Sequence, residues 1–122
     1  MQPSSVCVGI DISKAQLDLA VEPGGESFTV PYDDQGLATL ILRLSPMAPR
    51  RIGVEATGGL ERRLLRALVE AGLPVIAVNP RQVRDFAKAT GQLAKTDALD
   101  AAVLARFAVV VQPPERTLPD PQ

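Results

Sequence analysis

Four acidic residues occupy positions from which their carboxylates could meet: Asp11, Glu55, Asp97 and Asp100. Asp11 and Glu55 each end a short apolar run of the kind that forms a buried strand. Because ligands of parallel and mixed sheets gather at the carboxyl ends of the central strands, both acids should reach one edge of a sheet. Asp97 and Asp100 stand near the start of a predicted helix with a spacing that places them on one side of it. We therefore expect all four carboxylates to converge.

Such a cluster predicts a particular chemistry. Neighbouring carboxylates raise one another's pKa unless a cation lies between them, and carboxylate oxygens prefer hard cations such as Mg²⁺ or Mn²⁺. Two such ions, roughly 4 Å apart, can activate a water and stabilise the leaving oxygen in phosphodiester hydrolysis. The chain has no histidine and a single cysteine, Cys7, which excludes an internal disulfide and leaves a zinc site or a Ser-His-Asp triad without its residues. Catalysis is therefore predicted to rest on carboxylates.

Each acid also has a purely structural interpretation. Asp97 can serve as a helix N-terminal acid that the macrodipole favours, Asp100 as a solvated side chain, and Asp11 as the acceptor of a turn at a strand end. Glu55 is harder to explain in this way, because the end of a buried strand is an unfavourable place for an unpaired charge. The metal site disappears only if all four structural interpretations hold together.

The elements that must carry these acids form a predicted α/β domain. Strands are expected at residues 5–11, 16–21, 26–30, 51–55 and 73–78, the first three as an antiparallel meander. Helices are expected at residues 35–44, 60–71 and 82–88 and from Asp97 to about Val110, the last with Thr96 as its N-cap. The strand, helix and strand between residues 51 and 78 imply parallel pairing with a right-handed crossover. This order predicts a mixed five-stranded sheet with helices on its faces, the pattern of the RNase H-like (RuvC-like) fold.

Length and hydropathy complete the domain prediction. Residues 1–110 are expected to form one domain, and residues 111–122, which are rich in proline, a flexible tail or linker. No apolar run approaches the length that spans a bilayer, and the N-terminus lacks a basic segment followed by an apolar stretch. We expect a cytoplasmic protein that does not enter the membrane.

The charge distribution is compatible with a nucleic-acid partner. The net charge is −1, but residues 50–106 hold ten basic and six acidic side chains, a net charge of +4. Basic residues in the connections and the short helix that flank the acids are predicted to hold phosphates, with a solvated helix face as the alternative. These residues are Lys14, Arg81, Arg84, Lys88 and Lys95. Aromatic residues make up only 3%, which disfavours binding through base stacking.

Four runs of sequence resemble a known family. They are VGIDISK at residues 8–14, GVEATG at 53–58, VNPRQVRDFAK at 78–88 and, most specifically, AKTDALDAA at 94–102. Their order and spacing are similar, over residues 6 to about 108, to the N-terminal DEDD domain of the IS110/IS1111-type transposases, which are also described as bridge-RNA-guided recombinases. A lone Gly-Ile-Asp is weak evidence, whereas Lys-Thr-Asp-x-x-Asp-Ala downstream of Asn-Pro-x-x-Val is specific.

The resemblance implies roles for individual residues. Asp11, Glu55, Asp97 and Asp100 match the DEDD metal ligands, and other motif positions near that site are matched by Ser13, Lys14, Thr57, Gly58, Asn79, Lys95 and Thr96. Leu60 departs from the pattern, because the family tends to carry an aromatic residue there. That departure puts a local packing or nucleotide contact in question and leaves the metal site unaffected.

The resemblance also implies activity and partners. It predicts Mg²⁺ or Mn²⁺ dependent cleavage and exchange of DNA strands in transposition, with DNA, a guide RNA and a homo-oligomeric assembly as partners. Proteins of this family continue into a second domain that bears a serine thought to attack DNA, and nothing in this chain corresponds to that domain. We therefore expect the chain to be either a truncated piece of a longer protein or the product of a fragmentary gene. Alone it should bind metal but fail to complete recombination.

Three other functions remain open from the sequence. A self-sufficient nuclease resembling Holliday-junction resolvases would share the acid tetrad. A nucleotide-binding fragment of the actin and sugar-kinase superfold also begins with Gly-Ile-Asp, but it would need a glycine-rich turn where this chain has Ile12, Ser13 and Lys14. A dimerisation module without catalysis is the third.

Overall fold

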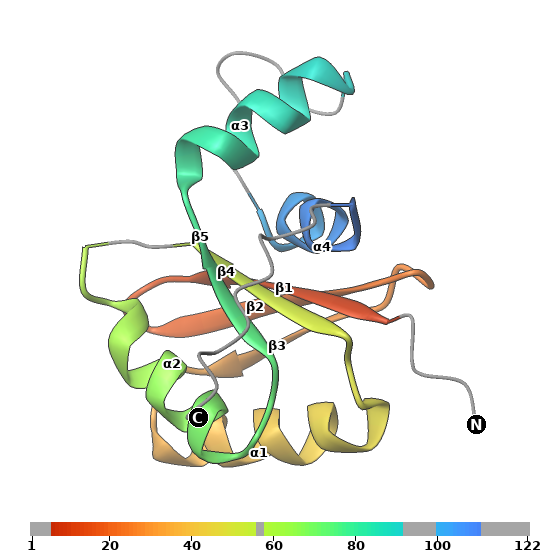
Figure 1. Ribbon diagram of the computed structural model, residues 1–122. Coiled ribbons are helices and arrows are strands. Elements are labelled where there is room, and N and C mark those ends of the chain that lie inside the picture. Colours follow the sequence, from red (N-terminus) through yellow and green to blue (C-terminus); the bar gives the residue numbers. More distant parts are fainter. Residues whose placement is uncertain (1–5, 56–57, 92–99, 111–122) are drawn as a thin grey trace, which may run out of the picture.

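A single mixed sheet forms the centre of the molecule. The computed structural model describes residues 6–55, 58–91 and 100–110. Its sheet has the strand order β3-β2-β1-β4-β5 (Figure 1). The strands are β1 (Cys7–Ile12), β2 (Gln16–Glu22), β3 (Ser27–Pro31), β4 (Arg51–Glu55) and β5 (Val75–Val78). β1, β2 and β3 pair as an antiparallel meander, whereas β4 pairs in parallel with both β1 and β5. The predicted topology is therefore confirmed.

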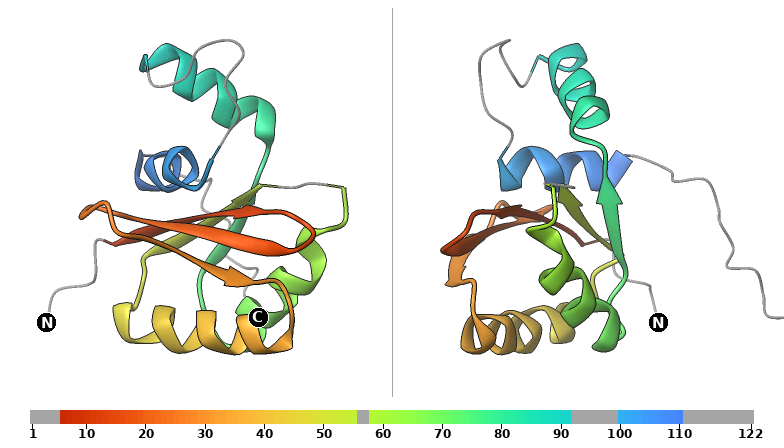
Figure 2. Two further views of the ribbon diagram at one scale, coloured as in Figure 1. Left: turned by 180° about the vertical axis from the view of Figure 1, so that it is seen from behind. Right: turned by 90° about the vertical axis from the view of Figure 1, so that its left-hand side faces the viewer.

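Helices cover both faces of this sheet. They are α1 (Asp34–Leu44), α2 (Glu61–Glu70), α3 (Pro80–Ala89) and α4 (Ala101–Val110), with a short 3-10 turn, η1 (Ser45–Met47), after α1. α1 and α2 lie on one face and α4 on the other, while α3 projects beyond the end of β5 (Figures 1 and 2). None of the helices in the described part of the chain has the length and apolar character that a membrane crossing requires.

The start of the last helix differs from the prediction. Asp100 precedes α4 instead of lying in its first turn, and its carboxylate accepts a hydrogen bond from the backbone N–H of Val103 at 3.0 Å. Its carbonyl oxygen accepts another from the N–H of Leu104, so Asp100 has the bonding pattern of an N-cap residue. The expected N-cap, Thr96, and the expected first helical residue, Asp97, lie outside the described residues, as does the predicted tail at 111–122.

Alternation along the central strands divides the sheet into two different faces. Val8 and Ile10 of β1, like Ile52 and Val54 of β4, are fully buried against the α1 and α2 side. Residues between them on the chain face α4 and are small, polar or charged. The large aliphatic core thus lies on one side of the sheet, and the predicted site residues Asp11 and Glu55 are directed to the other.

α4 lies unusually close to the middle of the sheet. Gly9 of β1 sits beneath it, and a Cβ atom at this position would come within 2.2 Å of the Ala101 carbonyl oxygen and 2.3 Å of the Ala105 amide nitrogen. Ala20, Ala101 and Ala105 form a small buried cluster at the same contact. Only a glycine in β1 permits this approach, which brings the beginning of α4 next to the carboxyl half of the strand.

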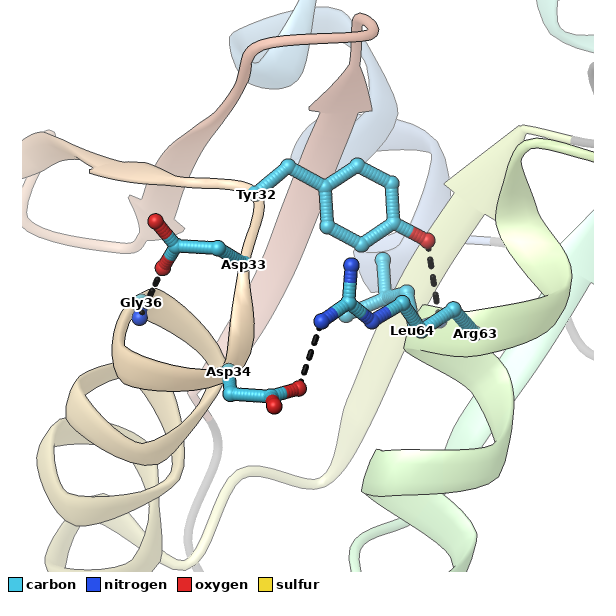
Figure 3. A network of polar contacts seen from close by, with 6 residues as sticks. All are labelled: Tyr32, Asp33, Asp34, Gly36, Arg63 and Leu64. Carbon is cyan, nitrogen blue, oxygen red and sulfur yellow. Dashed lines mark hydrogen bonds and ion pairs between the residues drawn. The ribbon is translucent and has the colours of Figure 1, made fainter.

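A polar network ties the beginnings of α1 and α2 together on the opposite face (Figure 3). The Tyr32 hydroxyl donates to the Leu60 carbonyl at 2.6 Å and accepts from the Leu64 N–H at 3.0 Å. Asp33 caps α1 by accepting from the Gly36 N–H at 2.8 Å, and Asp34 pairs with an arginine of α2, Arg63. These contacts hold the two helices beneath the sheet.

Candidate metal centre

Asp11 lies near the end of β1, on the face that α4 covers. It is half-buried, and the strand register places it directly opposite Asp18 of β2. Burial raises the pKa of the Asp11 carboxyl above its ordinary value, and the negative charges of Asp18 and Asp100 raise it further. Two acids from other elements therefore lie close enough to Asp11 to disfavour its ionisation.

Glu55 is the last residue of β4, the parallel neighbour of β1. It is half-buried, and its pKa is raised by burial first and then by the charge of Asp11. Arg84 of α3 acts in the opposite direction and lowers the pKa of Glu55. Both strand-end acids thus meet at one edge of the sheet, as the sequence predicted, and a basic residue lies nearby.

Asp100 reaches the same region from the start of α4. It is exposed, and together with Asp11 it lines a cavity of about 520 Å³ beside the sheet. Asp11 is therefore near Glu55 on one side and near Asp100 on the other. Asp97, the fourth predicted ligand, lies outside the described residues.

The chemistry of these donors suits a hard divalent cation. Asp11, Glu55 and Asp100 offer only carboxylate oxygens, the ligand type that Mg²⁺ and Mn²⁺ prefer. Across residues 6–55, 58–91 and 100–110, however, no three histidine, cysteine or acidic side chains lie close enough together to hold one metal ion. The described residues therefore supply only part of the predicted ligand set.

The sequence analysis did not single out Asp18, which the structure places at this site. Its side chain accepts hydrogen bonds from the Thr29 hydroxyl at 2.7 Å and from the Gln16 side-chain amide at 3.2 Å. Like charges directly opposite one another on antiparallel strands are destabilising, so the pairing of Asp18 with Asp11 has no evident structural benefit. The hairpin register about the turn at residues 13–15 was the signal that could have identified it.

The predicted phosphate-binding residues are placed differently from one another. Arg84 lies near Glu55, as the effect of its charge on that carboxyl shows. Arg81 and Lys88 are exposed on the same helix, α3, and Lys14 is exposed in the turn between β1 and β2, shortly after Asp11. Lys95 lies outside the described residues. Of this set, the structure thus brings Arg84 into the electrostatic environment of the acids.

Comparison with solved structures identifies the fold. The chain is similar to RuvC of T. thermophilus, solved in complex with a Holliday junction substrate, with a TM-score of 0.54. The match covers 86% of this chain and 88% of that one, at 22% sequence identity. The protein therefore has a RuvC-like form of the RNase H-like fold, as predicted.

Comparison of sequences identifies the family. Residues 8–122 match the profile of the DEDD transposases of the IS110 type, and the chain belongs to this transposase family. It is 29% identical over 117 residues to the pilin gene-inverting proteins of Moraxella lacunata and Moraxella bovis. Each alignment covers 91% of this chain but 36% of the relative, so the chain spans about a third of the length of these relatives.

Proposed function

We propose that this domain performs metal-dependent cleavage and exchange of DNA strands during transposition of an insertion sequence. The observation that carries the proposal is the placement of two carboxylates beside Asp11, which lies near the end of β1. Glu55 ends the parallel neighbour β4, and Asp100, at the start of α4, lines one cavity with Asp11. Such an accumulation of negative charge opposes folding unless a cation relieves it. Membership of the transposase family and the RuvC-like fold support the same function.

In this proposal Asp11, Glu55, Asp97 and Asp100 are the catalytic acids and together hold Mg²⁺ or Mn²⁺, with two ions at the centre. When bound, the ions supply an activated water and stabilise the leaving oxygen of a phosphodiester. The protein contributes fixed positions for the acids: β1 and β4 are central strands, and α4 rests directly on β1 at Gly9. A rigid sheet edge keeps the carboxylates in place between binding and reaction.

The phosphate backbone of DNA would be held by basic residues around the acids. We assign this role to Lys14, Arg81, Arg84, Lys88 and Lys95. The position of Arg84 near Glu55 supports the assignment, since α3 continues from β5, whose Val78 pairs with Glu55 at the same sheet edge. A guide RNA and homo-oligomeric assembly belong to this proposal as features of a longer protein.

The direct test is a titration with Mn²⁺, followed by NMR line broadening at Asp11 and Glu55 and by thermal denaturation. We expect the wild-type chain to show saturable broadening and a rise in melting temperature, and Asp97→Asn to lose both. Glu70→Gln, an exposed substitution on α2 at the other face of the sheet, is the matched control and should behave as wild type. Broadening that is absent from the wild type, or unchanged in Asp97→Asn, would contradict the proposal.

A second function is supported by the similarity to RuvC, which covers most of both chains. In this alternative the domain alone cleaves branched DNA. Incubation of the chain with a synthetic four-way junction and Mn²⁺ separates the two functions. Cleavage that Asp11→Asn abolishes would favour a self-sufficient nuclease, whereas metal binding without cleavage would favour a domain that needs the rest of its protein.

A further inference from the structure

The cavity beside Asp11 extends away from the other strand-end acid. It is lined by Asp11, Asp18, Ser27, Thr29, Asp100 and Ala102, among others, and so lies between the β2 and β3 strands and the start of α4. Glu55 is not part of its lining, because β4 lies on the other side of β1. The cavity therefore begins at the candidate metal centre and continues toward the β3 edge of the sheet.

Short side chains leave this space open. Ser27, Thr29 and Ala102 line the cavity with small side chains, and α4 is held at the middle of the sheet by its contact with Gly9. The resulting volume of about 520 Å³ lies within the range of roughly 300 to 1,000 Å³ that is typical of sites for small organic ligands. The cavity is thus large enough for a nucleoside.

The charges of the cavity select the kind of group that can enter. Three carboxylates line it, those of Asp11, Asp18 and Asp100, and none of its lining residues in the described part of the chain is basic. Asp11 and Asp100 are candidate metal ligands, whose charge a bound cation would offset. Asp18, on β2, would still repel a phosphate in the rest of the cavity, whereas a neutral group would not be repelled.

The hydrogen bonds of Asp18 add a preference. The Thr29 hydroxyl donates its hydrogen to Asp18 at 2.7 Å, so the oxygens of this pair are left to accept hydrogen bonds. A ligand with N–H groups would satisfy them. The amino groups of nucleic-acid bases are donors of this kind.

We propose that this cavity receives the neutral nucleoside of a DNA nucleotide whose phosphate is held at the neighbouring metal centre, with Asp18 and Thr29 accepting a hydrogen bond from the base. The inference rests on the proposed function, since it takes the phosphate position from the metal centre. It adds a base contact that does not require aromatic residues, because the base would lie against small side chains instead of stacking on a ring.

Two strands with equal numbers of phosphates test this site: an oligodeoxyadenylate and an abasic strand of the same length. Binding to the chain is measured by fluorescence anisotropy in Ca²⁺, with NMR shifts at Ser27 and Ala102 as a local readout. We expect the wild type to bind the strand with bases about tenfold more tightly, which corresponds to about 1.4 kcal/mol. The NMR shifts at the cavity should appear with that strand alone.

Variants separate the cavity from the phosphate contacts. Ala102→Leu fills the cavity and should remove the preference for bases while leaving binding of the abasic strand unchanged. Ala38→Leu, an equal substitution at an exposed position of α1 on the other face, should retain the preference. Thr29→Val replaces the hydroxyl of an exposed residue by a methyl group and removes its hydrogen bond to Asp18. It should reduce the preference, and it decides the question independently if Ala102→Leu does not fold.

The results of these measurements distinguish a failure of the nucleoside site from a failure of the proposed nucleic-acid interface. Equal affinity of the wild type for both strands, or a preference that survives in Ala102→Leu and in Thr29→Val, would overturn the nucleoside site and leave the phosphate contacts standing. Tighter binding of an oligoriboadenylate than of the DNA strand would also overturn it and assign the cavity to RNA. Failure of every strand to bind would refute the nucleic-acid interface itself, and this inference with it.

Discussion

Replacing Gly9 by alanine should push α4 away from the sheet and so increase the distance between Asp100 and Asp11. The added Cβ would lie 2.2 Å from the Ala101 carbonyl oxygen and 2.3 Å from the Ala105 amide nitrogen. Both are backbone atoms of α4, so no side chain can turn aside, and the helix must withdraw by about 1 Å to restore ordinary contact. Overpacking of this kind costs about 3 kcal/mol, at the upper end of the usual range. Withdrawal of α4 also moves Asp100 away from Asp11.

Gly53 of β4 provides the matched comparison beneath the same helix. A Cβ there would lie 3.4 Å from the Leu104 carbonyl oxygen and 3.5 Å from the Ala108 Cβ, which is ordinary contact. We expect Gly53→Ala to change the free energy of unfolding in urea by less than about 1 kcal/mol, and Gly9→Ala to lower it by about 3 kcal/mol and to weaken Mn²⁺ binding. Equal urea midpoints and equal Mn²⁺ affinities for the two variants would refute the reasoning that Gly9 sets the position of α4.

Two further substitutions test the two faces of the sheet. Burial and the charges of Asp18 and Asp100 raise the pKa of Asp11, so its ionisation destabilises the metal-free fold as the pH rises from the ordinary carboxyl value through the raised one. In urea denaturation without metal, Asp11→Asn should therefore raise the free energy of unfolding at neutral pH by about 0.5 to 1 kcal/mol. The gain should shrink toward acid pH, and a loss of stability at pH 7 would contradict this. Tyr32→Phe removes the hydrogen bonds to Leu60 and Leu64 and should lower the free energy of unfolding by about 1 to 3 kcal/mol. Thermal denaturation measures this loss, and the Mn²⁺ affinity should stay unchanged. An unaltered melting temperature would show that the network does not join α1 to α2.

The strand-end acids illustrate what local sequence can predict about a site. An apolar run that ends in an acid indicates both the strand and the position of its carboxylate, and β4 has the bounds that its residues predicted. The order of strands and helices then places Asp11 and Glu55 at one edge, because parallel neighbours end on the same side. Asp100 was predicted near that edge but within the first turn of the last helix. In the structure it precedes α4, and its side chain caps that helix.

The sequence by itself determined the order of strands and helices, the acids that end β1 and β4, and carboxylates as the available chemistry. These depend on strand ends and residue types within short segments. Only the tertiary structure decided that Asp18 faces Asp11, that Arg84 acts on Glu55, and that a cavity opens between β2, β3 and α4. The facing of Asp18 and Asp11 depends on the register of a local hairpin. The cavity and the position of Arg84 depend on how α4 and α3 lie against the sheet, which is set by contacts between residues far apart in the chain. A pattern read along one strand carries no information about such distances.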